Sequence, residues 1–141
     1  MIRMPEVSKP HPLALVEAGL AIASGSLRIR LQSFDRVARW AIGSAPAARP
    51  ADVMEAAQAR RAVLAWSRRV PWRALCMEQG IAAARLLARR GLPAVIHYGA
   101  VVKEGSLTAH VWVTSASIPV IGCENASEFA VLSRFSNGSS S

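Results

Sequence analysis

The spacing of apolar residues changes about two thirds of the way along the chain. Between residues 13 and 92 the apolar positions recur mostly at intervals of three and four, a spacing typical of helices buried on one side. From residue 93 to 135, β-branched and aromatic runs alternate with turn residues, which is typical of strands. The sequence therefore predicts a helical first half followed by a small antiparallel sheet.

The first two helices are predicted over residues 13–43 and 53–69. In the first, the Ser-Gly-Ser segment at 24–26 leaves open a break in the middle, because these residue types are common in turns. The second opens on Asp52, which has the residue type and position of a helix cap. Arg60 interrupts its apolar stripe, so the buried side of this helix is less clearly defined than that of the first.

A third predicted helix contains Cys76 and ends at Gly91, since glycine commonly terminates helices. Residues 94–102 and 107–114 then predict two strands joined by a Lys-Glu-Gly-Ser hairpin turn. A short third strand at 118–121 contains a proline, which favours the edge of the sheet. The order of elements is helices first, then an antiparallel sheet.

Length and composition predict one domain. The chain has 141 residues, of which 52% are hydrophobic and 18% charged, enough for a core without disulfide staples. We expect a single domain over residues 1–135, followed by a disordered tail at 136–141 with a serine-rich, low-complexity composition.

The chain is basic, with 17 Lys+Arg against 9 Asp+Glu and a net charge of +8. No compact basic block or aromatic RNA-binding motif accompanies this charge, so a solvated arginine-rich surface is favoured over nucleic-acid binding. The longest uncharged apolar stretch, residues 18–27, is too short to span a bilayer, and no secretory signal is visible. Two cysteines are too few for a disulfide framework. We expect a cytoplasmic protein without stable membrane insertion.

Cys76 and His110 are the candidates for chemistry. A thiol becomes a useful nucleophile when a histidine takes its proton and helix-end amides stabilise the thiolate. This would require the helix to begin near Arg73 or Leu75, because the effect of the helix dipole fades beyond the first turn. From spacing alone, a packing cysteine and a structural histidine remain the simpler interpretation. Two cysteines and three scattered histidines predict no metal site, and we expect no cofactor.

Several motifs follow one another in order between about residues 70 and 135. They are Cys76, Arg-Arg-Gly-Leu-Pro-Ala at 89–94, Gly105, and His-Val-Trp-Val at 110–113. This order resembles the B-protein leader peptidases of lasso-peptide biosynthesis, which are transglutaminase-like cysteine proteases. That family usually has alanine after the histidine, where this chain has Val111.

The resemblance implies an α+β fold of the papain or transglutaminase type and a peptidase that removes the leader from a ribosomally made precursor peptide. By the family's roles, Cys76 would attack the scissile carbonyl. His110 would hold the thiolate as an ion pair and protonate the leaving amine. The backbone N–H of Cys76 is the natural first donor to the oxyanion.

The chain departs from the family at the third catalytic position. An aspartate about a dozen residues after the histidine usually orients the imidazole, and that place falls near Gly122. Glu124 is the first candidate for this role and Asn125 the second. A backbone carbonyl acting in their place, or a weakened site, are the remaining alternatives.

The resemblance also implies partners. These are the precursor peptide, a leader-binding recognition-element protein, and the macrolactam synthetase that closes the ring. The helical first half lacks the alternating strands of a recognition element, so we expect the stand-alone form of the peptidase. The competing interpretation is a non-catalytic precursor-binding scaffold with a degenerate site, which the absent aspartate favours. Nucleic-acid binding ranks third.

Overall fold

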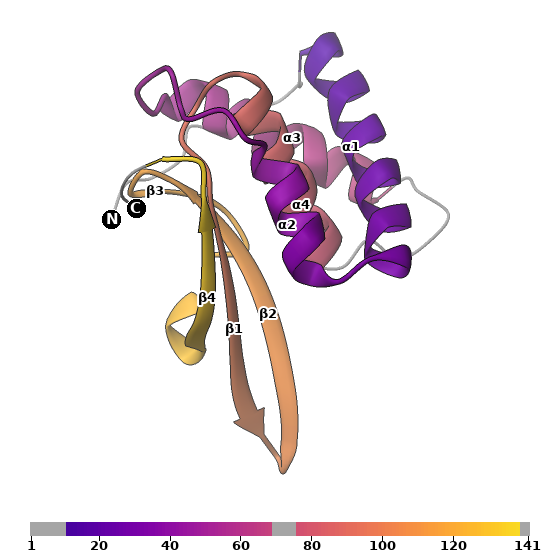
Figure 1. Ribbon diagram of the computed structural model, residues 1–141, viewed down its shortest axis with the longest axis vertical. Helices are drawn as coiled ribbons and strands as arrows, with labels where there is room; N and C mark the ends of the chain where they lie inside the picture. The colour runs from indigo at the N-terminus through magenta and orange to yellow at the C-terminus, as the bar shows by residue number, and fades with distance from the viewer. Residues whose placement is uncertain (1–10, 69–75, 139–141) are drawn as a thin grey trace.

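The computed structural model describes residues 11–68 and 76–138. Within these residues, four helices precede four strands, and the strands form one antiparallel sheet in the order β3-β2-β1-β4 (Figure 1). The predicted α+β order with a helical first half is confirmed. The elements are α1 (Pro12–Leu31), α2 (Phe34–Ile42), α3 (Val53–Ser67), α4 (Cys76–Arg89), β1 (Val95–Lys103), β2 (Ser106–Ser115), β3 (Ile118–Ile121), a 3-10 turn (Ala126–Glu128) and β4 (Ala130–Ser136).

The first predicted helix is two helices, but the break does not fall at the Ser-Gly-Ser segment. α1 runs through residues 24–26 and ends at Leu31, and α2 begins after Ser33. Gly25 is buried, and a Cβ at this position would lie 3.1 Å from Cγ2 of Ile81. The segment is therefore a site of close packing between α1 and α4, which outweighs the low helix propensity of glycine.

The second helix begins as predicted. The Asp52 side chain accepts a hydrogen bond from the backbone N–H of Glu55 at 3.0 Å and caps α3. The predicted end of this helix at residue 69, and the helix start near residues 73–75 that the nucleophile interpretation requires, lie outside the described residues. Cys76 is the first described residue of α4.

The predicted hairpin is confirmed, with a tighter turn than expected. β1 and β2 pair as far as Lys103 and Ser106, which leaves Glu104 and Gly105 as a two-residue turn. Both have positive φ, 52° and 79°, the combination that matches the right-handed twist of a hairpin. β3 lies at the edge of the sheet, as its proline predicted.

β4 was not predicted. The tail was expected to be disordered from residue 136, but residues 136–138 are ordered in the structure. Ser136 is the last residue of β4, and Phe135 pairs with Ile96 of β1 in the sheet. Asn137 is buried: its side chain accepts from the N–H of Ala94 and donates to the carbonyl of Leu92, both at 2.9 Å. These bonds fix a segment whose composition alone suggested disorder. Residues 139–141 lie outside the described part.

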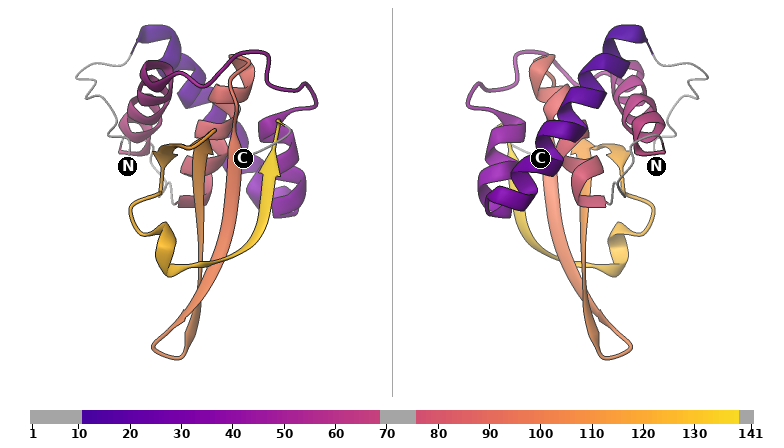
Figure 2. Two further views of the ribbon diagram at one scale, coloured as in Figure 1. Left: turned by 90° about the vertical axis from the view of Figure 1, so that its left-hand side faces the viewer. Right: turned by 90° about the vertical axis from the view of Figure 1, so that its right-hand side faces the viewer.

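The helices cover one face of the sheet, and the segment between β3 and β4 crosses the other (Figure 2). α4 packs directly on β2, where a Cβ on Gly80 would lie 2.6 Å from Cγ1 of Val111. α1 and α3 pack in turn against α4. The core therefore lies between α4 and the face of the sheet that carries Val111 and Val113.

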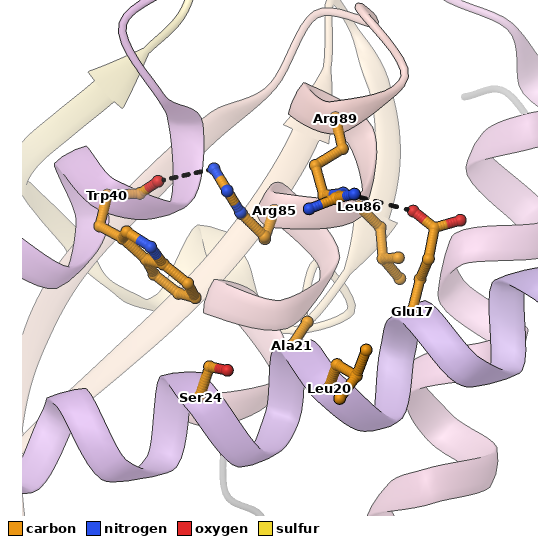
Figure 3. Close-up of a pocket in the computed structure, with 8 residues that line it drawn as sticks. All are labelled: Glu17, Leu20, Ala21, Ser24, Trp40, Arg85, Leu86 and Arg89. Carbon is orange, nitrogen blue, oxygen red and sulfur yellow. Dashed lines mark hydrogen bonds and ion pairs between the residues drawn. The ribbon is translucent and has the colours of Figure 1, made fainter.

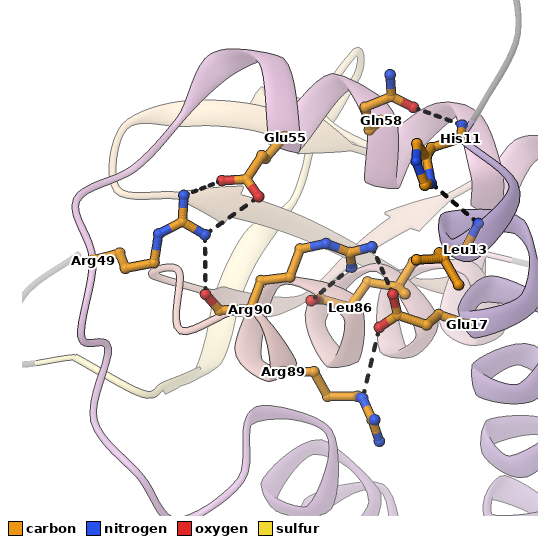
Figure 4. Close-up of polar contacts among 9 residues, drawn as sticks. All are labelled: His11, Leu13, Glu17, Arg49, Glu55, Gln58, Leu86, Arg89 and Arg90. Atoms are coloured by element: carbon orange, nitrogen blue, oxygen red, sulfur yellow. Dashed lines mark hydrogen bonds and ion pairs between the residues drawn. The ribbon is translucent and has the colours of Figure 1, made fainter.

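Ion pairs tie the ends of the helices together (Figure 4). Glu17 of α1 pairs with Arg90 at 2.7 Å and with Arg89 at 3.7 Å. Arg49, in the connection before α3, pairs with Glu55 and donates to the Arg90 carbonyl at 3.2 Å. The C-terminal end of α4 is thereby linked to both α1 and the start of α3.

Candidate active site

His110 lies on β2 in an aromatic setting. Its ring stacks on Phe129 with centroids 4.9 Å apart and on Trp112 at 5.8 Å. Its Nε2 atom lies 2.7 Å from the carbonyl oxygen of Gly122. A carbonyl can only accept a hydrogen bond, so Nε2 carries the proton. In the neutral ring, Nδ1 is then left with a lone pair and can act as a base.

Gly122 occupies the place where the resemblance leads one to expect an aspartate. Its φ is +73°, and a Cβ would lie 2.8 Å from the carbonyl oxygen of Val111 and 3.3 Å from Cβ of Trp112. Both the backbone conformation and the lack of space exclude a side chain here without local movement. The histidine meets a main-chain acceptor at the position of the family's carboxylate.

Glu124, the first candidate for orienting His110, pairs with Arg60 instead, at 3.3 Å, and its side chain is 68% exposed. Arg60 also donates to the carbonyl of Val120 at 3.1 Å. This contact accounts for the arginine that interrupts the apolar stripe of α3, because its guanidinium reaches across to β3. Asn125, the second candidate, is exposed and precedes the 3-10 turn.

Cys76 has a half-buried free thiol at the described start of α4. It lies one helical turn before Gly80 and on the same side of the helix, and Gly80 contacts Val111, the neighbour of His110. In the described structure no hydrogen bond joins the Cys76 thiol to the His110 imidazole. The helix that carries the thiol and the strand that carries the histidine are in direct contact.

The alternation of side chains along β2 determines how the two groups can approach. Val111 faces α4, so His110 belongs to the opposite face of the strand. β3 pairs with β2 only from Val113 onward, which leaves the edge of β2 at His110 without a β3 partner. The imidazole and the helix that carries the thiol therefore lie on opposite faces of β2, and Gly122 lies against the edge of this strand at His110 and Val111.

His97 has the environment of a structural residue. It is 9% exposed, its Nε2 lies 3.0 Å from the hydroxyl of Thr114, and its ring stacks on Trp112 with centroids 5.3 Å apart. Burial, and secondarily the charge of Arg134, lower its pKa to about 4. It is therefore neutral at physiological pH.

Cys123 also resembles a packing residue. Burial raises the pKa of its thiol, and Sγ donates to the carbonyls of Val113 at 3.4 Å and Ile121 at 3.5 Å. The described residues contain no group of three or more His, Cys, Asp or Glu side chains that could hold a metal ion.

Sequence reasoning missed Phe129, which stacks on His110. The only signal was a lone aromatic residue in the polar segment 122–130. That segment crosses the sheet because β4 returns beside β1, and β4 itself was not predicted. Without β4 there was no reason to place Phe129 at the site.

Comparison with known proteins identifies the family. The sequence model described as the transglutaminase-like superfamily matches residues 21–134, most of the chain. No curated protein and no solved structure matches this chain. The superfamily is commonly related to cysteine peptidases. The matched segment runs from α1 to β4 and contains both Cys76 and His110. The chain therefore belongs to the transglutaminase-like superfamily.

Proposed function

We propose that this chain is a cysteine peptidase that removes the leader from a lasso-peptide precursor. The observation that carries the proposal is the hydrogen bond from His110 Nε2 to the Gly122 carbonyl. This bond selects the neutral tautomer whose Nδ1 can accept a proton from a thiol. The family's usual carboxylate would select the same tautomer, so its absence does not remove the base.

The mechanism follows from these groups. Nδ1 of His110 takes the thiol proton of Cys76, and the thiolate attacks the scissile carbonyl of the precursor. The backbone N–H of Cys76 donates to the oxyanion. The imidazolium then protonates the leaving amine, which is the new N-terminus of the core peptide. Water, deprotonated by the same imidazole, releases the leader as a carboxylic acid.

The surroundings suit an ion pair between thiolate and imidazolium. Phe129 and Trp112 both stack on the His110 ring and also contact each other, so this aromatic cluster restricts water beside the imidazole. A helix start near Cys76, the first described residue of α4, would place the thiol where the amides of a helix favour negative charge. A partly desolvated pair of this kind attracts more strongly than one in bulk water.

The lasso-peptide assignment is supported by the ordered motifs from Cys76 to Val113, together with membership of the superfamily. We propose that the chain acts with a separate leader-binding protein and hands the trimmed core to a macrolactam synthetase, in the cytoplasm.

The decisive experiment is cleavage of a cognate precursor in the presence of the leader-binding protein, followed by mass spectrometry. Cys76→Ala and His110→Ala should abolish cleavage at a single bond. Cys123→Ala and His97→Gln are controls of the same residue types, since Cys123 follows Gly122 and His97 stacks on Trp112, but neither is assigned a chemical role. Cleavage that survives in Cys76→Ala, or that is lost equally in Cys123→Ala, would contradict the assignment.

A second candidate function is a non-catalytic scaffold for the precursor and its enzymes. The absence of a hydrogen bond between Cys76 and His110, and the glycine at the aspartate position, favour it. Alkylation of Cys76 in a Cys123→Ala background separates the two functions. A peptidase requires a thiol that reacts at neutral pH and slows down in His110→Ala, whereas a scaffold requires an inert thiol that is indifferent to His110.

A further inference from the structure

Large apolar side chains line the outer side of α1. They are Leu13, Val16, Leu20, Leu27 and Leu31, each between 58% and 73% exposed. Their spacing of three, four and seven residues places them along one side of the helix. This row, called the α1 stripe, extends over about 27 Å at the rise of an α-helix.

The inner side of α1 is also apolar, but its residues are small. Ala14, Ala18 and Ala21 are buried, and a Cβ on Gly19 would lie 2.8 Å from the ring of Trp66. By length and composition, residues 12–29 are apolar enough to cross a membrane, and a third of them are buried. A helix that is apolar on every side is usually covered on every side. The outer side of α1 therefore has the composition of a covered surface.

A pocket of about 140 Å³ opens beside the middle of the α1 stripe (Figure 3). Leu20 of the stripe forms one wall. Trp40 of α2, and Arg85 and Arg89 of α4, line the others. The pocket and the stripe are thus one continuous surface, built from three helices.

The pocket is basic, because Arg85 and Arg89 line it and Arg28 stacks on the ring of Trp40, which forms one of its walls. The guanidinium of Arg28 lies 4.3 Å from the ring centroid of Trp40, and that of Arg85 lies 5.0 Å from it. Arg85 also donates to the carbonyl of Trp40 at 3.1 Å. Burial, and then the charges of Arg89 and Arg28, lower the pKa of Arg85. The guanidinium groups repel one another, and a carboxylate between them would relieve that repulsion.

The acidic side chain available in the described lining is already engaged. Glu17 pairs with Arg90 at 2.7 Å and with Arg89 at 3.7 Å. It therefore does not balance Arg28 and Arg85. Positive charge is in excess at one point, beside a row of exposed leucine and valine side chains.

We infer that the α1 stripe and the basic pocket form a docking surface for an amphipathic helix of another protein. That helix would lay its apolar side chains along the stripe and place a Glu or Asp carboxylate among the arginines. Helices pack in this way when apolar residues recur at heptad-like spacing and flanking charges are complementary. The inference is independent of the proposed peptidase activity.

Charge and shape distinguish this partner from two others. A membrane-surface helix carries its charged side opposite its apolar side, whereas that side of α1 is buried against α3 and α4. The arginines cluster at a concave site rather than along a flat surface. A second copy packed through the same surface would bring its own Arg85 and Arg89 to the pocket, whereas its Glu17 is already paired.

The test uses the full chain and a synthetic helical peptide of about 20 residues, with leucine at the a and d heptad positions and glutamate at e and g. A second peptide carries lysine in place of glutamate. Isothermal titration should show that the glutamate peptide binds at least about tenfold more tightly than the lysine peptide. Added salt should reduce this difference.

Three variants locate the binding surface. The double variant Leu20→Ser, Leu27→Ser should weaken binding of the glutamate peptide about tenfold or more. Arg89→Glu should reduce the preference for glutamate over lysine. Leu107→Ser, which changes an exposed leucine at the hairpin end, is the control and should bind like the wild type. Circular dichroism confirms that each variant is folded.

Other outcomes overturn the inference. Equal binding of the two peptides, or no binding of either up to about 1 mM, excludes an acidic helical partner. Binding to phosphatidylcholine–phosphatidylglycerol vesicles that is tighter than peptide binding and is lost in the double leucine variant indicates a membrane surface. Self-association that is lost in the same variant indicates a second copy.

Discussion

The imidazole Nε2 of His110 lies 2.7 Å from the carbonyl oxygen of Gly122. The side chain that is expected to work as a base is thus held by the main chain, at the position where related enzymes are expected to use a carboxylate. A peptide carbonyl can orient a ring as well as a carboxylate can, but it supplies no full negative charge to stabilise an imidazolium. The bond itself leads to the first prediction.

Neutral His110 should be the Nε2–H tautomer. Nitrogen-15 NMR of the imidazole, at a pH where the ring is neutral, distinguishes the two tautomers directly. The expected spectrum shows a protonated Nε2 coupled to the ring protons and an unprotonated Nδ1. An Nδ1–H tautomer would mean that the bond to Gly122 does not form, and Nδ1 could not then accept the thiol proton.

Gly122→Ala should impair activity more than an equally strained substitution elsewhere. Alanine at Gly122 meets both a positive φ and a carbonyl 2.8 Å from its Cβ, so the segment must move away from His110. We expect kcat/KM for precursor cleavage to fall by about tenfold to a hundredfold.

Gly105→Ala is the matched control for this substitution. Its φ of +79° imposes similar backbone strain, but nothing lies within 4 Å of the added Cβ. It should cost about 1 kcal/mol of unfolding free energy and leave cleavage unchanged. Equal losses of activity in the two variants would show that the carbonyl of Gly122 has no specific role.

Stability should fall as the pH is lowered from about 6.5 to about 4, partly because of His97. The folded pKa of His97 is about 4, below the ordinary value of 6.5, so the unfolded chain binds more protons within this window. The contribution is fully present above about pH 6.5, amounts to up to about 3 kcal/mol, and is lost as the pH approaches about 4.

Urea unfolding of wild type and His97→Gln across this pH window isolates the effect. Glutamine can still bond to the hydroxyl of Thr114 but does not titrate. The difference in unfolding free energy between the two proteins should therefore shrink toward acidic pH. A difference that stays constant from about pH 7 to about pH 4 would mean that His97 titrates normally in the folded protein.

Asn137→Ala should be strongly destabilising, although it lies in a segment of low complexity. The substitution leaves the N–H of Ala94 and the carbonyl of Leu92 without their partner in a buried place. We expect a loss of about 2–4 kcal/mol in the unfolding free energy measured by denaturant titration. Asn125→Ala, at an exposed position, should change it by less than about 0.5 kcal/mol. Similarly small effects at both positions would mean that the bonds of Asn137 do not stabilise the fold.

The parts of the fold that could be predicted are those specified by local chemistry. Asp52 caps α3 by accepting from the N–H of Glu55, and Gly105 readily adopts the positive φ that the hairpin turn requires. β4 could not be found in this way, because its pairing joins Phe135 to Ile96 across the sheet. The real break between α1 and α2 was missed for a similar reason, since Gly25 packs on a distant helix.

The candidate site likewise has residues that could be predicted from the sequence and a backbone group that could not. Cys76 and His110 could be proposed from an ordered set of motifs, because side chains that do chemistry leave a sequence signal. Every residue has a backbone carbonyl, so no motif singles out the one that meets His110. The glycine at 122 becomes informative only once its φ and the closeness of Val111 are known.

Arg60 reaches from α3 to both sides of the carbonyl that holds His110. Its guanidinium donates to the Val120 carbonyl, two residues before Gly122, and pairs with Glu124, two residues after it. The position of the histidine's acceptor therefore depends on a helix about fifty residues earlier in the chain than His110 itself. If a genetic screen recovered Arg60 as essential, this residue would not be a third member of a catalytic triad. Its role would be to hold the loop around Gly122 in place beside β2.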